Sequence, residues 1–152
     1  MNTAHPHHRR DIKRAIEQST REHAQVLASA RGIEALVEAS VSPAPGDVAR
    51  QLRSFGDQLS AHFAEEEQEA LYSWVADECP WLALDIERTR QQHPRLVVSF
   101  RQLATEAGSA HEVGFATELG VRIRAAIASF RKHEADESRL LLVALRRDQQ
   151  AG

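Results

Sequence analysis

The sequence predicts an all-α protein, an up-down-up-down four-helix bundle, and three observations support this prediction. The chain has 152 residues, of which 42% are hydrophobic and 27% charged, so it can form one domain with a buried core. Aromatic residues make up only 5%, and β-branched residues nowhere alternate with polar ones over a long stretch, which disfavours a sheet. Breaker residues divide the chain into four long segments, and apolar residues recur within each at helical spacing.

Residues 10–40 predict the first helix, which follows a flexible N-terminal arm at residues 1–9. Its apolar residues are spaced by threes and fours and form one stripe: Ile12, Ile16, Val26, Ala30, Ile33 and Val37. His23 falls on this stripe, so its imidazole is expected to face the core. The segment ends in a run rich in proline and glycine between Ser42 and Asp47, and Asp47 can cap the following helix.

Residues 47–77 predict the second helix, whose apolar stripe leads directly to two polar residues. The stripe comprises Val48, Leu52, Phe55 and Leu59. The same alternation continues to His62 and Glu66, so both side chains should face inward. A histidine and a glutamate four residues apart lie one turn apart on the same face of a helix, where they can offer one nitrogen and one oxygen ligand.

Residues 80–107 predict the third helix, because Pro80 suits the first turn, where its missing N–H is not needed. One stripe holds the inward-facing residues: Leu82, Ile86, Thr89, His93, Leu96, Phe100 and Leu103. A histidine therefore sits among core positions here as well. Pro94 follows it and removes one backbone hydrogen bond, which predicts either a kink at this point or a helix that begins again; the sequence leaves both open.

Residues 111–148 predict the fourth helix, before a C-terminal tail at residues 149–152. Ser109 and Glu112 have the spacing of a capping box at its start. Its stripe comprises Ala116, Leu119, Ile123, Ala126, Phe130, His133, Glu137, Leu140 and Ala144. The histidine and glutamate of this stripe repeat the pair of the second helix. With this start, however, they lie roughly one or two turns too deep and need a longer lead-in.

The four predicted helices bury four histidines and two glutamates in one core. An unpaired buried carboxylate costs several kcal/mol, and no arginine or lysine lies on the stripes near Glu66 or Glu137. Protonation, water or a cation remain as partners. Four imidazoles and two carboxylates are too many for one tetrahedral zinc ion, but they suit two ions with five or six mixed ligands, iron best and manganese as an alternative. The predicted metal ligands are His23, His62, Glu66, His93, His133 and Glu137.

If both glutamates bridge, each ion receives two histidines and two carboxylate oxygens. This leaves room for an oxo or hydroxo bridge between two iron ions and for an exogenous ligand. Open coordination positions indicate small-molecule chemistry.

The order of these ligands resembles a known family. A single histidine, a His-x3-Glu pair, a second single histidine and a second His-x3-Glu pair, one element per helix, resemble the hemerythrin-like (HHE) cation-binding domain over residues 10–148. The resemblance implies two iron ions bridged by both glutamates. It assigns the histidines to the ions in pairs: His23 with His62, and His93 with His133. Ferritin-like sites use Glu-x-x-His with additional glutamates, whereas this chain has the reverse order and a wider spacing.

Val97 marks a departure from the oxygen-carrying members of that family. Those proteins have a further histidine four residues after the one that matches His93, and here that place holds valine. The iron held by His93 and His133 is therefore expected to have an open position of its own. Two open irons would suit the reduction of peroxide, nitric oxide or oxygen better than reversible oxygen carriage.

Four functions follow from these features. The first is a di-iron module that binds or senses a small diatomic ligand, oxygen or nitric oxide. The second is a redox enzyme that decomposes peroxide or reduces nitric oxide, and the third is iron storage or donation. The fourth is a helical interaction protein whose buried acids and histidines satisfy one another without metal. Storage ranks below the first two, because one pair of ions holds little iron.

Residues that flank the predicted ligands are expected to be peripheral. Of the acidic residues next to the two pairs, Glu65 or Glu134 could turn in to accept a hydrogen bond from an imidazole N–H, whereas the others are expected to be solvated. Tyr72 and Trp74 lie more than about two turns beyond His62 and are expected to pack rather than to bind metal.

The net charge of −3 and the absence of a long apolar run limit the expected partners. No basic field concentrates nucleic acid, and the longest apolar run, residues 140–145, is too short to cross a bilayer. No apolar signal peptide precedes the first helix, and the single cysteine, Cys79, cannot form an internal disulfide. A cytoplasmic protein with a small-molecule ligand, and without a nucleic-acid or membrane partner, is expected.

Overall fold

The computed structural model describes residues 6–68 and 70–151 of the chain and shows five α-helices. They are α1 (Pro6–Glu38), α2 (Pro45–Gln68), α3 (Leu71–Glu78), α4 (Ala83–Ser109) and α5 (Glu118–Ala151), and a short 3₁₀ helix, η1 (Pro80–Leu82), precedes α4. No strand occurs in this part of the chain, so the predicted all-α class is confirmed. Of the predicted N-terminal arm, residues 1–5 lie outside the described residues, and α1 begins four residues earlier than expected.

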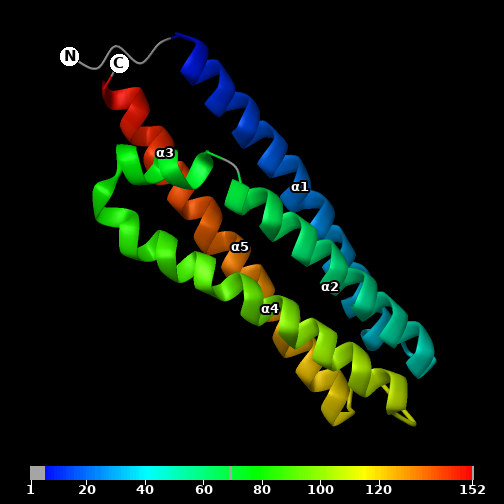
Figure 1. Ribbon diagram of the computed structural model, residues 1–152. Helices are drawn as coiled ribbons and strands as arrows, with labels where there is room; N and C mark the ends of the chain where they lie inside the picture. Colours follow the sequence, from blue (N-terminus) through cyan, green and yellow to red (C-terminus); the bar gives the residue numbers. More distant parts are fainter. Residues whose placement is uncertain (1–5, 69, 152) are drawn as a thin grey trace.

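The four long helices lie side by side (Figure 1). α2 packs against both α1 and α4, and α5 packs against both α4 and α1, so the set closes on itself. The connections 39–44 and 110–117 lie at one end of the molecule, and α3 lies at the other end, near both chain ends. Every long helix therefore has two neighbours against which it can bury an apolar face.

The prediction of a single helix over residues 47–77 is wrong, because α2 ends at Gln68 and the separate helix α3 follows. The reason is a change of phase. The buried stripe of α2, spaced by threes and fours as far as Glu66, would next reach residues 69, 70 and 73, which are polar or small. The next large apolar side chains do not lie on the continuation of this stripe, and they become buried only because the chain turns. These residues are Leu71, Tyr72, Trp74 and Val75.

The start of the last helix also differs from the expected one. Ser109 is the final residue of α4, and α5 begins only at Glu118, so the capping box expected at Ser109 and Glu112 does not form. Thr117 takes its place: its hydroxyl lies 3.0 Å from the backbone nitrogen of Gly120, which donates to it. α5 extends to Ala151, into the predicted tail.

Pro94 lies inside α4, which continues without interruption from Ala83 to Ser109. The possibility that the helix begins again at Pro94 is therefore excluded. His93 keeps its place on the buried face of the helix directly before the proline.

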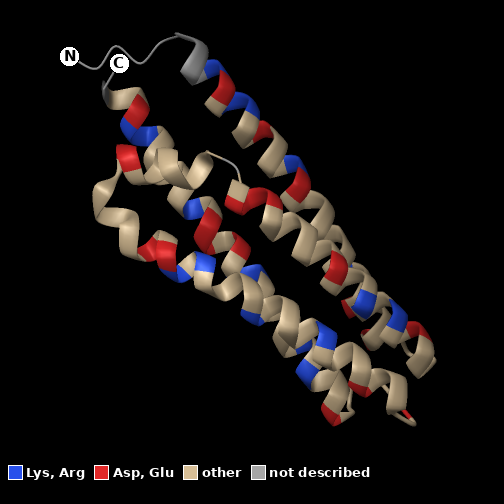
Figure 2. Cartoon of the chain, in the orientation of Figure 1, with Lys and Arg blue, Asp and Glu red and all other residues tan. Residues whose placement is uncertain are grey.

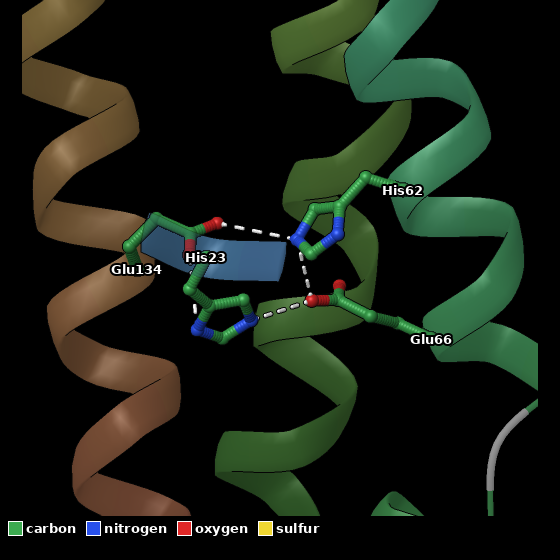
Figure 3. Close-up of side chains that lie close together, drawn as sticks. All are labelled: His23, His62, Glu66 and Glu134. Atoms are coloured by element: carbon green, nitrogen blue, oxygen red, sulfur yellow. Dashed lines mark hydrogen bonds and ion pairs between the residues drawn. The ribbon is translucent and has the colours of Figure 1, made fainter. Parts of the chain in front are cut away.

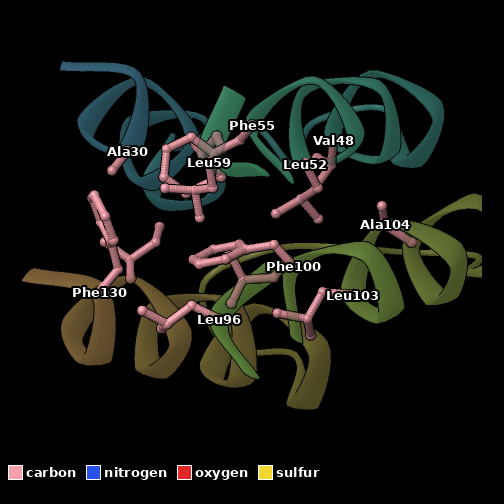
Figure 4. Close-up of a cluster of buried hydrophobic side chains, with 14 of the residues drawn as sticks. Ala30, Val48, Leu52, Phe55, Leu59, Leu96, Phe100, Leu103, Ala104 and Phe130 are labelled. Atoms are coloured by element: carbon pink, nitrogen blue, oxygen red, sulfur yellow. The ribbon is translucent and has the colours of Figure 1, made fainter. Parts of the chain in front are cut away.

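The apolar core forms two clusters separated along the helices. The larger cluster includes Phe55, which packs edge-on against Phe100 at a centroid distance of 4.7 Å and against Phe130 at 5.4 Å (Figure 4). The smaller cluster lies around α3 and is made of Ile12, Tyr72, Trp74, Val75, Cys79, Leu82, Ile86, Leu140 and Ala144. On α1 and α5 the candidate ligands fall between the residues of the two clusters, so a polar layer lies between two apolar ones.

Acidic and basic residues are interspersed along the helices (Figure 2). In the described part of the chain, no helix is both long enough and apolar enough to cross a membrane.

Candidate metal centre

All six predicted ligands meet in the polar layer between the two apolar clusters. His23 comes from α1, His62 and Glu66 from α2, His93 from α4, and His133 and Glu137 from α5. Their exposed fractions lie between 2% and 7%.

The late start of α5 removes the depth mismatch expected for the fourth helix. His93 lies 16 residues before the end of α4, and His133 lies 15 residues after the start of α5. Connection 110–117 supplies the lead-in that the sequence required.

The imidazoles form two pairs, and Glu66 lies between them. The ring centroids of His23 and His62 are 5.1 Å apart, and those of His93 and His133 are 4.9 Å apart. Glu66 Oε1 lies 2.9 Å from His23 Nε2 and 2.7 Å from His62 Nε2, as Figure 3 shows. Its other oxygen, Oε2, lies 3.5 Å from His93 Nε2. One carboxylate thus faces both pairs.

Glu137 takes a similar position from α5. Its Oε2 lies 3.5 Å from His23 Nε2 and 3.9 Å from His133 Nε2. This carboxylate therefore also faces one histidine of each pair.

The Nδ1 atoms of the histidines point away from this centre, toward outer acceptors. Three such contacts are within hydrogen-bond distance: His23 Nδ1 to Glu134 Oε2 at 3.2 Å, His93 Nδ1 to Glu67 Oε1 at 3.1 Å, and His133 Nδ1 to Gln92 Oε1 at 2.8 Å. His62 Nδ1 has Glu22 Oε2 at 4.0 Å. For His93 and His133, the hydrogen-bonded acceptor at Nδ1 keeps the proton there and leaves Nε2 free as a metal ligand.

Glu134 is more central than the sequence indicated. Its side chain is buried, and besides its contact with His23 it places Oε1 3.7 Å from His62 Nε2 (Figure 3). His23, His62, Glu66 and Glu134 each offer a donor atom within 4.8 Å of the others. Glu65, the other candidate acceptor, is exposed. Glu67 is exposed, as expected, and also accepts a hydrogen bond from His93 Nδ1.

Tyr72 lies at the centre, which corrects the expectation that it only packs. Its hydroxyl donates a hydrogen bond to Glu137 Oε1 and lies 3.5 Å from His93 Nε2. The turn between α2 and α3 brings it there, and the phase change at Leu71 was the sequence signal that could have indicated this turn. Gln92 and Glu22 were also missed, and no spacing within one helix identifies them, because each faces a histidine of another helix.

Charge in this layer is divided unevenly without metal. Burial would lower the pKa of His62, but the nearby carboxylates of Glu134 and Glu66 outweigh it and raise that pKa to about 10. Burial would raise the pKa of Glu66, but the hydrogen bond with His23 and the nearby imidazole of His62 lower it to about 2. Burial and the nearby charge of Glu66 raise the pKa of Glu137 to about 8. Metal-free, His62 is thus held as a cation beside anionic Glu66.

The remaining polar atoms have no adequate partner, and a metal ion would supply one. Buried side-chain atoms without a hydrogen bond gather here: His62 Nε2, His133 Nε2, Glu66 Oε2, both oxygens of Glu134, and Glu137 Oε2. Within the described chain, Glu66, Glu134 and Glu137 form ion pairs only with histidines. Burying three carboxylates without arginine or lysine is unfavourable, and this mixture of imidazole and carboxylate donors fits iron or manganese.

Three hollows reach the layer from the surface, and one of them, of about 380 Å³ between α4 and α5, is lined by His133 and Gln92. A second, of about 460 Å³, lies between α1 and α5 and is lined by His23 and Glu134, with Arg31 and Arg131 farther out. The third, of about 380 Å³, lies beside His93 between α2 and α4. A small molecule can therefore approach either pair of histidines.

No family model matches this chain, and none of the curated proteins or solved structures matches it either. The geometry of the centre alone therefore carries the functional argument. The protein is helical and contains a buried cluster of histidine and glutamate residues that could hold metal. This arrangement is compatible with a hemerythrin-like fold.

Proposed function

We propose that this chain is a non-haem di-iron protein that binds or senses a small diatomic ligand, oxygen or nitric oxide. The observation that carries the proposal is the arrangement of two imidazole pairs around two shared carboxylates. His23 and His62 would hold one ion, His93 and His133 the other, and Glu66 and Glu137 would bridge. Two bound irons would supply one-electron redox chemistry and open positions for a diatomic ligand.

We propose for the fold the up-down-up-down four-helix bundle of hemerythrin-like proteins. The support is the closed set of contacts among the four long helices and the short connections at one end. The helices bring one ligand element each to a common level, in the order that the resemblance implies.

The chain's own residues orient the imidazoles. Phe63 stacks flat on His93 at a centroid distance of 4.0 Å and an angle of 3°, and meets His133 edge-on at 5.3 Å. The acceptors at Nδ1 fix the rotation of the rings. A small ligand would reach His23 through the hollow between α1 and α5, or His93 through the hollow between α2 and α4.

The alternative, a redox enzyme that decomposes peroxide or reduces nitric oxide, is favoured by one specific observation. Tyr72 and Glu134 place a phenol and a carboxyl group inside the centre, and both reactions consume protons. Glu134 would hold a proton next to the ion of His62, and Tyr72 next to that of His93.

Rapid mixing separates these functions. The iron-loaded protein is reduced and mixed anaerobically with nitric oxide, and in separate experiments with oxygen or peroxide, while its absorption spectrum is followed. A binding or sensing protein forms one stable adduct with a 1:1 ligand stoichiometry. An enzyme instead consumes excess ligand over repeated cycles when reductant is present. No spectral change with any of the three ligands would refute both functions.

His111→Ala is the matched control for these experiments. His111 is exposed in the connection between α4 and α5, so its loss should leave the spectra unchanged, whereas His133→Ala should abolish them.

A further inference from the structure

Tyr72 is an aromatic side chain of the polar layer to which the proposed binding or sensing function gives no role. It is 6% exposed, and its ring belongs to the smaller apolar cluster while its hydroxyl reaches Glu137 and the inward nitrogen of His93. The guanidinium of Arg90 lies over the ring, 5.3 Å from its centroid. The phenol reaches this point only because α2 ends at Gln68 and the chain turns into α3.

The donors of the two halves of the centre are unequal. The half around His23 and His62 also has Glu66 and Glu134 as a group of four possible donors. In the other half, His133 also forms a group with Glu134 and Glu137, whereas among the described residues His93 belongs to a single group, with Glu66 and His133. Among the described side chains, the hydroxyl of Tyr72 is the oxygen that lies beside His93 Nε2 on the side of Glu137. An ion bound beside His93 would therefore meet the phenol oxygen on the side where this histidine has the fewest other donors.

We propose that Tyr72 is a further protein ligand of the ion held by His93 and His133, bound through its phenolate oxygen. This inference rests on the proposed di-iron site. Phenolate is an established ligand of ferric iron in proteins, and the charge of a metal ion reverses the preference of a buried acid for its neutral form.

The proton balance of this ligation is closed by Glu137. The O–H bond of Tyr72 breaks with its electron pair left on oxygen, which donates to the ion. The proton moves along the existing hydrogen bond to Glu137 Oε1 and leaves to solvent as that carboxylate takes up the metal. No electron is transferred in this step.

The test uses the colour of ferric phenolate. Wild-type chain is loaded with iron(II), oxidised with ferricyanide, desalted, and assayed for iron; its visible spectrum and its Raman spectrum excited within the visible band are recorded. We expect a charge-transfer band with enhanced tyrosine ring vibrations. The chain contains a single tyrosine, so ring-deuterated tyrosine must shift these vibrations if Tyr72 is the ligand.

Two variants give the matched comparison. Tyr72→Phe keeps the ring and its packing but should lose the band completely while it still holds two irons per chain. Trp74→Phe changes another buried aromatic residue of α3 and should keep the band.

The outcomes distinguish this inference from the function on which it rests. Two irons per chain without the enhanced ring vibrations, or a band that survives in Tyr72→Phe, would overturn the ligation by Tyr72 and leave the di-iron site standing. A wild-type chain that takes up no iron would overturn both.

Discussion

Each imidazole in the polar layer uses its two nitrogens differently. Nε2 faces the shared carboxylates, and Nδ1 faces an acceptor contributed by a different helix from that of the histidine. The inward positions of the six candidate ligands could be predicted from sequence because helical phase alone decides which residues face the core. The outer acceptors could not, because they depend on how one helix is rotated against the next.

Gln92 offers a direct test of this division. Its Oε1 lies 2.8 Å from His133 Nδ1, so Gln92→Ala removes the group that keeps the proton on Nδ1. We expect iron affinity to fall by about 10- to 100-fold. The neighbouring Gln91 bonds only to Glu87 on the exposed face, and Gln91→Ala should have the affinity of the wild type. Competition with a chelator measures both, and equal affinities for the two variants would contradict this role.

Without metal, the stability of the protein should fall as the pH rises from 7 to 9. His62 keeps its proton to about pH 10 in the folded chain but loses it near 6.5 when unfolded, so its contribution is present below 6.5 and is lost as the pH approaches 10. Glu137, whose pKa is raised to about 8, also binds a proton more tightly in the folded chain, and its effect has the same sign.

Urea unfolding of the chelator-treated protein at several pH values measures this slope. His62→Gln should flatten it, because this variant lacks one of the groups whose pKa folding raises. A free energy of unfolding that rises between pH 7 and 9 would show that the charges are arranged otherwise.

At the scale of the helices, the sequence predicted the four long elements but not the turn that separates α2 from α3. Four apolar stripes with clear breaks were sufficient for the first result. The turn depends on Tyr72 and Trp74 finding a place under the ends of α1, α4 and α5, which only the assembled helices provide. The late start of α5 depends similarly on Thr117, which caps this helix, whereas the sequence had indicated Ser109 as the capping residue.

Pro94 is the residue at which α4 should be least stable. The helix continues through it although its nitrogen cannot donate to the preceding turn. Pro94→Ala restores that bond, and we expect the free energy of unfolding to increase by about 1–3 kcal/mol, with part of the gain offset by a more flexible unfolded chain. Arg95→Ala, at the next exposed position, is the control. If urea unfolding finds Pro94→Ala no more stable than Arg95→Ala, Pro94 does not destabilise α4.

At the scale of the whole molecule, a polar layer separates two apolar clusters, and metal would join them. Without a metal ion the layer holds carboxylates and imidazoles with unsatisfied atoms, which oppose the packing of the clusters on either side. Removal of metal should therefore lower the melting temperature and broaden the transition, because the two clusters become less strongly coupled.

Re-addition of iron, followed by calorimetry, should restore a single sharp transition. The variant Glu65→Ala, altered on the exposed face, should behave as the wild type throughout. Identical melting curves with and without metal would mean that protonated histidines and carboxyl groups satisfy the polar layer without a metal ion.

The iron content of the protein purified without a tag tests the central claim most directly. Because His5, His7 and His8 could bind metal loosely, the assay includes a chain in which these three are replaced by alanine. We predict two irons per chain in both forms, and their loss in His62→Ala and in Glu137→Ala. A folded wild-type chain without iron, or ligand variants that remain fully loaded, would contradict the di-iron centre.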